Sequence, residues 1–419
     1  MDEKTTCAIV GGGPAGMVLG LLLARAGVDV TVLEKHADFL RDFRGDTVHP
    51  TTLRLIDELG LWPQFAALPQ SRLRNAALEV SPGHSIKLVD FERLPQPHPY
   101  IAMVPQWDLL NLLAEAGAAE PSFTLRMSTE VTGLLRDNGR ISGVRYQGAD
   151  GPGELRADLT IGCDGRSSLA RRDAGLQVRE WPTSFDVWWF RLPQPEDDAS
   201  YTLFPRVAPG KAMIVIPREG YLQIAMLIPK GSDARLRARG LEAFHADVLE
   251  LLPEAGDTVT TVTTLDDVKH LDVRLNRLRH WHTDGLLCIG DAAHAMSPAG
   301  GVGINMAVQD GVAAARLLAE PLRRRRVTGR DLAAVRRRRV VPAAVTQAFQ
   351  RQIDSRLLGP ILRGGGAAGP PAALVSMFEH APWLAVIPGY LVGVGVRPER
   401  APDFARRTPR SPDQKPRDC

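Results

Sequence analysis

The sequence predicts an α/β protein in which a domain built on a parallel sheet is interrupted by a second, mostly antiparallel β-sheet. A short apolar run at 7–10 leads through a glycine-rich turn into a helical pattern at 18–26, as in a strand–helix–strand unit. Two later apolar runs, at 159–163 and 285–290, each end at an aspartate and indicate that the chain returns to the same sheet. Residues 181–268, which lie between these runs, form the most β-rich part of the sequence. The second sheet is therefore expected to be an insertion.

The first turn of the parallel-sheet domain is rich in glycine. Gly11 is expected to allow the tight turn, Gly13 to let the backbone approach a pyrophosphate, and Gly16 to let helix and strand pack closely. The helix that follows presents free N–H groups and the positive end of its dipole to phosphates. The turn therefore predicts a phosphate site formed by Gly11, Gly13, Pro14, Ala15 and Gly16.

A second apolar strand at 30–33 ends at Glu34. A glycine run alone is weak evidence, because ordinary turns contain glycine too. Flanking strands and a terminal acid complete the pattern of a Rossmann-like dinucleotide-binding unit. Glu34 is expected to accept hydrogen bonds from the two hydroxyls of an adenosine ribose, and Lys35 is assigned to the same site.

Changes of pattern along the chain predict its organisation. We assign residues 1–75, 101–180 and 270–320 to the dinucleotide-binding domain, and 76–100 and 181–269 to the inserted sheet. Within the insertion, strands are expected at 185–190, 201–204, 212–216, 221–228 and 259–265, with a helix near 241–252. Residues 321–396 are expected to form a C-terminal helical region. The tail at 397–419 is rich in Pro, Arg and Asp and is expected to be disordered.

Composition argues against several classes of protein. With 44% hydrophobic and 24% charged residues, the 419-residue chain is typical of a soluble globular protein. The net charge of +3 is spread widely, and the arginine clusters at 323–326 and 336–339 lie in helical patterns, so no nucleic-acid partner is expected. The most apolar late segment, 383–396, is broken by Pro388 and glycines, so no membrane span is expected. With no signal peptide and no CxxC spacing, we expect a cytoplasmic protein with reduced cysteines and no metal site.

Two later motifs join the glycine turn in a pattern. The segment from Asp164 through Arg171 has the form DGxxSxxR, and Gly290-Asp291 is followed by the glycine-rich segment from Pro298 through Asn305. In this order and spacing the three motifs resemble those of single-component FAD-dependent monooxygenases, the para-hydroxybenzoate hydroxylase-like flavoproteins that include polyketide and antibiotic hydroxylases. The resemblance covers roughly residues 5–320.

The resemblance implies an FAD-binding domain of the GR2 type. Asp291 would accept a hydrogen bond from a ribityl hydroxyl. The backbone from Pro298 to Asn305, and the helix that follows, would face the flavin ring. The residues assigned to this loop are Pro298, Gly301, Gly303, Ile304 and Asn305.

Asp164 would lie near the FAD pyrophosphate and a transient nicotinamide nucleotide, although a cap on the next helix is an alternative role. Arg44 corresponds to an arginine near the flavin. Gln106 stands where relatives often carry arginine, so its contact with the ribityl chain is less firmly implied. His294 is expected to be structural. No second GxGxxG follows a predicted strand to mark a permanent NAD(P)H domain, so the resemblance implies that NADH or NADPH docks only transiently.

The substrate wall is expected to come from the inserted sheet. Alternation places Trp188 and Phe190 on one face of their strand, and Tyr221 and Gln223 on one face of theirs. These four residues are the candidates for substrate contact, although aromatic strand residues are more often part of a core.

The resemblance implies an enzyme that uses NAD(P)H and O₂ to hydroxylate an aromatic or polycyclic small molecule of secondary metabolism, through a flavin C4a-hydroperoxide. Baeyer–Villiger insertion or epoxidation on the same scaffold stays open, as does an FAD-dependent reductase that transfers no oxygen. The protein is expected to be a monomer or a homodimer.

Overall fold

The computed structural model describes residues 3–40, 47–81, 84–194, 204–218, 220–364 and 372–408. Its largest sheet has eight strands, and its central part is parallel, in the order β20 (Leu286–Cys288), β11 (Gly151–Gly162), β1 (Glu3–Val10), β2 (Val30–Leu33) and β8 (Phe123–Arg126). Antiparallel strands extend it: β19 (His282–Thr283) pairs with β20, while β10 (Arg140–Gly148) pairs with β11 and with β9 (Glu130–Asp137). The predicted α/β class is confirmed.

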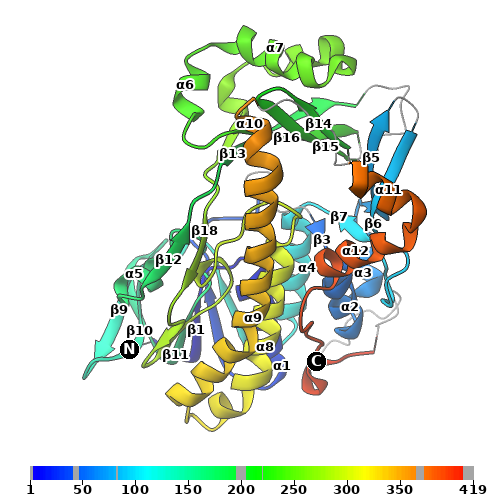
Figure 1. Ribbon diagram of the computed structural model, residues 1–419. Helices are drawn as coiled ribbons and strands as arrows, with labels where there is room; N and C mark the ends of the chain where they lie inside the picture. The colour runs from blue at the N-terminus through cyan, green and yellow to red at the C-terminus, as the bar shows by residue number, and fades with distance from the viewer. Residues whose placement is uncertain are drawn as a thin grey trace.

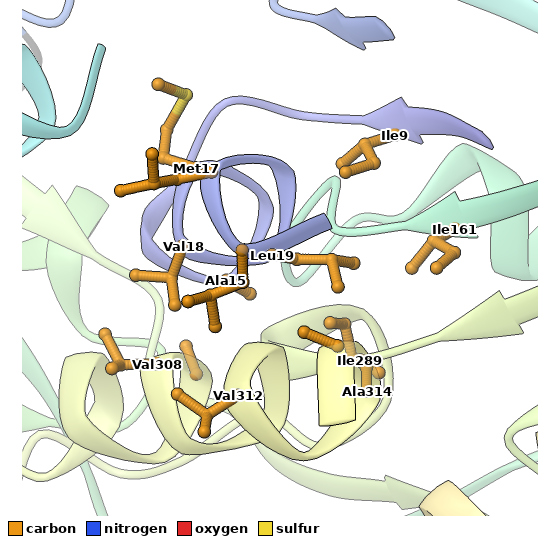
Figure 2. Close-up of a cluster of buried hydrophobic side chains, with 14 of the residues drawn as sticks. Ile9, Ala15, Met17, Val18, Leu19, Ile161, Ile289, Val308, Val312 and Ala314 are labelled. Atoms are coloured by element: carbon orange, nitrogen blue, oxygen red, sulfur yellow. The ribbon is translucent and has the colours of Figure 1, made fainter. Parts of the chain in front are cut away.

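The core of this domain lies between the sheet and three helices: α1 (Pro14–Arg25), α4 (Gln106–Ala118) and α8 (Gly303–Arg323). Figure 2 shows Val18 of α1 beside Val308 and Val312 of α8, with Ile9 and Ile161 projecting from the strands. A Cβ atom added to Gly311 would lie 2.9 Å from the Ala15 carbonyl oxygen, so glycine at this position lets α1 and α8 approach closely.

The inserted sheet has five antiparallel strands in the order β14 (Phe204–Ala208), β15 (Lys211–Pro217), β16 (Tyr221–Pro229), β13 (Phe185–Pro193) and β17 (Lys269–Leu271). Helices α6 (Asp233–Arg237) and α7 (Leu241–Leu251) lie over its outer side (Figure 1). The predicted helix near 241–252 is therefore confirmed. A two-stranded ribbon, β12 (Val178–Trp181) with β18 (Leu275–Leu278), leads into and out of this sheet.

The predicted strand at 259–265 is wrong. Residues Pro253–Thr261 form a 3₁₀ helix that is kinked at Gly256, where φ is +47°. The buried residues Ala255 and Val259 of this helix, and Val262 directly after it, recur at helical spacing and pack against the sheet core. The β-branched composition suggested a strand, but this spacing describes the packing better.

Smaller sheets lie beside the main one. Strands β3 (Thr47–Val48), β7 (Ile101–Met103) and β4 (Ser71–Leu73) form one, and β5 (Asn75–Ser81) and β6 (His84–Asp90) form another. Of residues 76–100, expected in the inserted sheet, those of β5 and β6 therefore pair in a separate hairpin, and residues 91–100 form no strand. The short helices α2 (Pro50–Glu58), α3 (Trp62–Ala66) and α5 (Leu169–Asp173) complete this part of the chain.

The C-terminal region is helical, with α9 (Gly329–Ile353), α10 (Gly359–Leu362), α11 (Ala372–His380) and α12 (Val386–Gly393). Helix α9 runs along α8 and continues through a π-helical turn, Asp354–Leu358, to α10 beneath the inserted sheet (Figure 1). Among the described residues, no helix combines the length and apolar character needed to cross a bilayer.

The predicted disorder of 397–419 is wrong for residues 397–408. Glu399, Ala401 and Ala405 are each at most 2% exposed. Glu399 receives Arg338 Nε at 2.6 Å, and the Ala401 amide donates to Glu58 at 2.7 Å. These long-range contacts hold a polar segment that composition alone marks as disordered. Residues 409–419 lie outside the described part.

Candidate flavin and substrate site

The glycine turn has the geometry that its sequence predicts. Gly11 has φ of +101°, and a Cβ there would lie 2.7 Å from the carbonyl oxygen of Cys163. A Cβ on Gly16 would overlap the Gly11 carbonyl, whereas a Cβ on Gly13 would meet no atom within 4 Å. Helix α1 starts at Pro14 without a side-chain cap, so its first N–H groups are not taken by a capping side chain. The turn is therefore tight at both ends and open in the middle, where a phosphate would lie.

Glu34 closes this turn from the neighbouring strand. It is 2% exposed, and its Oε2 accepts a hydrogen bond from the Gly12 amide at 2.8 Å. The other oxygen, Oε1, accepts from the His36 amide at 3.1 Å. The carboxylate is therefore fixed at the end of β2, beside the open side of the turn. Lys35 is exposed.

Asp164 caps the helix that follows it and leaves one carboxylate oxygen without a partner in the described part of the chain. Its Oδ2 accepts a hydrogen bond from the Ala170 amide at 3.0 Å, in the first turn of α5. Its Oδ1 is buried and has no hydrogen-bond partner among the described residues. A buried carboxylate oxygen without a donor is costly, so it marks a place for a ligand donor.

Arg171 ties the DGxxSxxR loop to the loop that carries Asp291. Its guanidinium donates to the carbonyl oxygens of Arg166, at 2.6 Å, and Ala292, at 3.2 Å. Arg166 Nε in turn donates to Asp291 Oδ2 at 3.3 Å. The two later motifs thus converge in space, as the resemblance implies, and Asp291 keeps a side chain that is 33% exposed.

The glycine-rich loop before α8 is held from both sides. Thr47 Oγ1 donates to the Gly301 carbonyl at 2.8 Å, and Gln350 Nε2 donates to Ser297 O at 2.7 Å and to Ala299 O at 3.0 Å. Gly300 and Gly301 have positive φ, and α8 starts at Gly303 without a side-chain cap. A Cβ on Gly303 would meet no atom within 4 Å. The N-terminus of α8 is therefore free to face an electron-rich ring.

His49 also contacts this loop. Its Nε2 lies 2.9 Å from the Gly301 carbonyl oxygen, and its Nδ1 lies 2.9 Å from that of Val392 in α12. The residue is fully buried, and burial lowers its pKa although both carbonyl contacts act in the opposite direction. A neutral imidazole carries one N–H, so it can donate to only one of these oxygens.

Asn305 and Gln106 have different surroundings. Asn305 is buried, and its Oδ1 accepts hydrogen bonds from Thr51 at 2.7 Å and Thr52 at 2.8 Å, so its side chain joins α8 to α2. Ile304 is also buried, in the core of the domain. Gln106 is half-buried at the first turn of α4. Arg44 lies outside the described residues.

His294 belongs to a buried ionic network. Its Nε2 lies 2.6 Å from Asp310 Oδ2, and Arg339 Nε lies 2.8 Å from Asp310 Oδ1. The Gly290 amide also donates to Asp310 at 3.0 Å. Burial alone would raise the pKa of Asp310, but its contacts with His294 and Arg339 hold it below its usual value. The histidine thus anchors the turn that positions Asp291, in agreement with a structural role.

The two candidate faces of the inserted sheet differ. Trp188 and Phe190 share a face, as predicted, but both pack against Phe244 of α7, with ring centroids 6.0 and 5.0 Å away. Trp188 is 2% exposed and Phe190 1% exposed, so they form the core beneath α7. The expectation that they contact substrate is therefore wrong.

The opposite face carries Trp189, a residue that our sequence argument missed. Ladder pairing places Trp189 opposite Ala225, and Tyr221 and Gln223 alternate onto this same face. Trp189 packs with Ile214 and Ile216 against Ile101 and Met103 of the neighbouring small sheet. Its Nε1 is buried without a hydrogen-bond partner among the described residues. Alternation separates the two faces of the strand in the sequence, but it does not say which face lies toward the cofactor domain. Our sequence argument therefore chose the wrong neighbour of Trp189.

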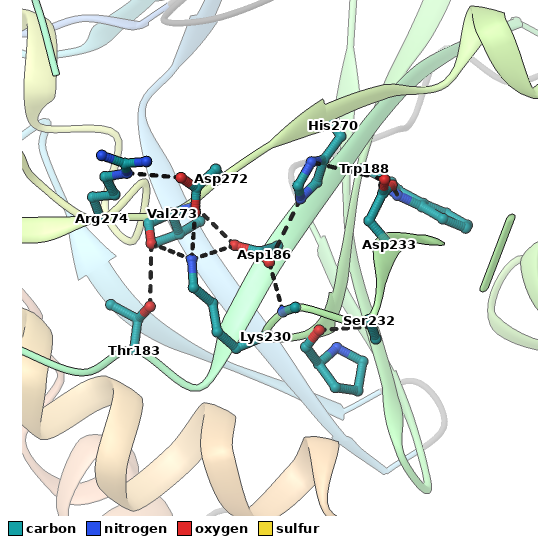
Figure 3. Close-up of polar contacts among 12 residues, drawn as sticks. Thr183, Asp186, Trp188, Lys230, Ser232, Asp233, His270, Asp272, Val273 and Arg274 are labelled. Carbon is teal, nitrogen blue, oxygen red and sulfur yellow. Dashed lines mark hydrogen bonds and ion pairs between the residues drawn. The ribbon is translucent and has the colours of Figure 1, made fainter. Parts of the chain in front are cut away.

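A buried charge cluster joins the inserted sheet to the cofactor domain (Figure 3). Asp186, 1% exposed, receives Lys230 Nζ at 2.7 Å and the amides of Gly231 and Val273, each at 2.9 Å. Although burial opposes it, these donors hold the pKa of Asp186 below its usual value. Arg166 donates to the carbonyl of Asp272 at 3.2 Å, so the cluster is linked to the Asp291 loop.

These features fit FAD. The space at Gly13, the unpartnered Asp164 oxygen and the two uncapped helix N-termini supply donors, acceptors and room for a dinucleotide. A profile of the FAD-binding domain family matches residues 4–348. The chain belongs to this family. The predicted cofactor and the resemblance drawn from the three motifs are thereby confirmed.

Comparisons with known proteins extend the match. The chain is 35% identical over 374 residues to 6-methylpretetramide 4-monooxygenase of Streptomyces rimosus, covering 88% of each protein. The OxyS anhydrotetracycline hydroxylase structure from the same species aligns with a TM-score of 0.74 at 24% identity, over 93% of this chain and 76% of that one. The first similarity confirms that the chain is an enzyme, and the second shows a shared fold.

One relative has another chemistry. Digeranylgeranylglycerophospholipid reductase 1 of Methanopyrus kandleri is 27% identical over 334 residues, or 75% of this chain and 80% of that protein. The scaffold therefore also occurs in a reductase.

Proposed function

We propose that this protein is an FAD-dependent monooxygenase that uses NAD(P)H and O₂ to hydroxylate a polycyclic aromatic small molecule of secondary metabolism. The observation that carries the proposal is the 35% identity, over 88% of both chains, to an enzyme named for oxygenating a polycyclic polyketide. The cofactor supplies the chemistry when it is bound: reduced by NAD(P)H, it activates O₂.

The protein's first task is to bind and orient the flavin. Glu34 would hold the adenosine ribose, and the Gly13 opening and α1 N-terminus would hold the phosphates. Asp291 would accept a hydrogen bond from a ribityl hydroxyl, and Arg166 would keep the carboxylate in place. The free N–H groups at the start of α8 would stabilise negative charge on the reduced ring.

Its second task is to keep water from the reacting atoms. The apolar layer of Trp189, Ile214, Ile216, Ile101 and Met103 lies between the inserted sheet and the small β3–β7–β4 sheet. A flat aromatic substrate suits such a wall, since stacking and burial need little directional bonding. The Trp189 N–H would then supply one hydrogen bond to a substrate oxygen.

The similarity to a reductase favours one alternative, an FAD-dependent reduction without oxygen transfer. The two functions differ in their need for O₂. The test is to incubate FAD-loaded enzyme and NADPH or NADH with a panel of polycyclic phenols, with and without O₂. We expect a product heavier by one oxygen atom, formed only when O₂ is present. A reduced product formed without O₂ would favour the reductase.

A further inference from the structure

Arginine side chains from three elements gather around Trp181, on the ribbon that leads to the inserted sheet. The guanidinium carbons of Arg179, Arg277 and Arg351 lie 5.0, 5.3 and 5.2 Å from the centre of its indole ring. Arg179 and Arg277 come from β12 and β18, and Arg351 comes from the end of α9. We call these three residues, together with nearby Arg336 of α9, the Trp181 arginine cluster.

The cluster has no neutralising acid. None of its four arginines forms a salt bridge with a carboxylate in the described part of the chain, whereas Arg338 and Arg339 of the same helix pair with Glu399 and Asp310. The polar contact of Arg277 is with the amide oxygen of Gln347, at 3.2 Å. The nearby histidine His282 adds no negative charge.

This arrangement is unfavourable for the folded protein by itself. Arg179 and Arg277 lie directly opposite each other in the antiparallel ribbon, a placement that destabilises a sheet when the charges are alike. Burial and the repulsion of Arg179, Arg351 and Arg336 lower the pKa of Arg277. Local arrangements that cost stability are typical of functional sites.

The chemistry of the cluster suits phosphate. Guanidinium groups bind phosphate oxygens through paired N–H donors, and several such groups around one point match a doubly or triply charged anion. Trp181 is half-buried, and its ring holds the three guanidinium groups in place.

The cluster is also connected to the flavin loop. Gln347, which contacts Arg277, donates to the carbonyls of Asn276 at 2.7 Å and Ala295 at 3.1 Å. One turn further along α9, Gln350 holds Ser297 and Ala299 at the entry to the glycine-rich loop. Helix α9 therefore connects an anion bound at the cluster with the glycine-rich loop of the flavin site.

We propose that the Trp181 arginine cluster binds the phosphate groups of the nicotinamide dinucleotide that reduces the flavin. Of the two GxGxxG runs in the sequence, only the run at 11–16 follows a strand and opens a helix, and we assign it to FAD, whereas the run at 364–369 follows helix α10. A second dinucleotide therefore has no such turn available and would be held by side chains. This inference rests on the proposed function only in taking NAD(P)H as the reductant. Free inorganic phosphate is the other source of the same chemistry.

The test compares the FAD-loaded wild-type enzyme with Arg179→Ala/Arg351→Ala and with the control Arg337→Ala, an exposed arginine of α9 that lies 14 residues before Arg351. NADPH and NADH are titrated anaerobically in rapid-mixing experiments that give the dissociation constant and the limiting rate of flavin reduction separately. Pyrophosphate and inorganic phosphate are titrated as competitors. FAD content and melting temperature report on folding, and Arg179→Lys/Arg351→Lys keeps the charge without the paired donors.

We expect the double alanine variant to raise the NAD(P)H dissociation constant about 10- to 100-fold, with its limiting rate of reduction and FAD content unchanged. The control variant should have the wild-type dissociation constant. The dissociation constant of the double lysine variant should lie between those of the wild type and the double alanine variant. Unchanged NAD(P)H affinity in a folded double variant would overturn the proposal, and so would loss of inorganic phosphate binding alone. Because flavin reduction is measured without O₂, this test of NAD(P)H binding stays valid even if the protein proves not to be a monooxygenase.

Discussion

Glu34 Oε2 lies 2.8 Å from the amide nitrogen of Gly12, so the acid at the end of β2 and the glycine turn after β1 form one unit. Replacing Glu34 with Ala removes this bond and the proposed acceptor for the ribose. We expect FAD affinity to fall by about 1–3 kcal/mol, the range for hydrogen bonds to charged groups. Equilibrium titration of the apoprotein with FAD gives this value.

A matched control for that variant is Asp38→Asn, an exposed acid four residues further along the chain. It should bind FAD as wild type does. If Glu34→Ala also kept wild-type affinity, the ribose assignment would be wrong.

The His294–Asp310–Arg339 network predicts a mild effect for substitution of His294 and a severe effect for substitution of Asp310. His294→Gln should leave most activity, because the histidine contacts Asp310 rather than the ligand side. Asp310→Asn should destabilise the fold by up to about 3–5 kcal/mol, since the buried Arg339 guanidinium then loses its nearest carboxylate and keeps, among the described residues, only Glu399 Oε1 at 3.9 Å. Urea unfolding and turnover with substrate measure the two effects. Complete loss of activity in His294→Gln with normal flavin content would contradict the structural role.

Asp310 also predicts a pH dependence. Its pKa is lowered in the folded state, so its contribution to stability is fully present above the unfolded value of roughly 4 and is lost as pH falls below it. Unfolding measured between pH 3 and 7 should therefore show a shallower acid limb for Asp310→Asn than for wild type. Parallel limbs would show that Asp310 carries no such linkage.

His49 predicts a second limb nearer neutral pH. Burial lowers its pKa, so the unfolded chain takes up a proton below about 6.5 that the folded protein does not. Stability should fall as pH drops from that value, and His49→Gln should flatten the slope by up to about 1.4 kcal/mol per pH unit. Residual slope is expected from His98 and His282, whose pKa values burial also lowers. An unchanged slope in the variant would refute the assignment to His49.

The two neighbouring tryptophans of β13 should behave differently. Trp188→Ala should cost about 3–5 kcal/mol of stability, because it empties the core beneath α7. Trp189→Phe should change stability much less and raise the KM for substrate roughly 5- to 30-fold by removing the unpaired N–H. Steady-state kinetics and thermal unfolding separate the two. Equal KM for Trp189→Phe and wild type would place the substrate elsewhere.

The geometry of the proposed phosphate-binding turn could be predicted from the sequence because its chemistry is local. Gly11 and Glu34 are close along a single strand–turn–helix–strand unit, and their spacing already describes the geometry. The substrate wall was harder, since alternation groups Trp188 with Phe190 but does not say which face α7 covers. The ordered tail was not predictable either, because Glu399 is held by Arg338 from a helix far away in the sequence.

The central claim is that an oxygen atom from O₂ reaches an aromatic substrate. The most direct test supplies ¹⁸O₂ to FAD-loaded enzyme with NAD(P)H and a polycyclic phenol that speeds NAD(P)H oxidation. Mass spectrometry of the product should show one ¹⁸O atom for each NAD(P)H consumed in coupled turnover, and no product in the absence of O₂. Product without ¹⁸O, or product formed under strict anaerobiosis, would contradict the monooxygenase assignment.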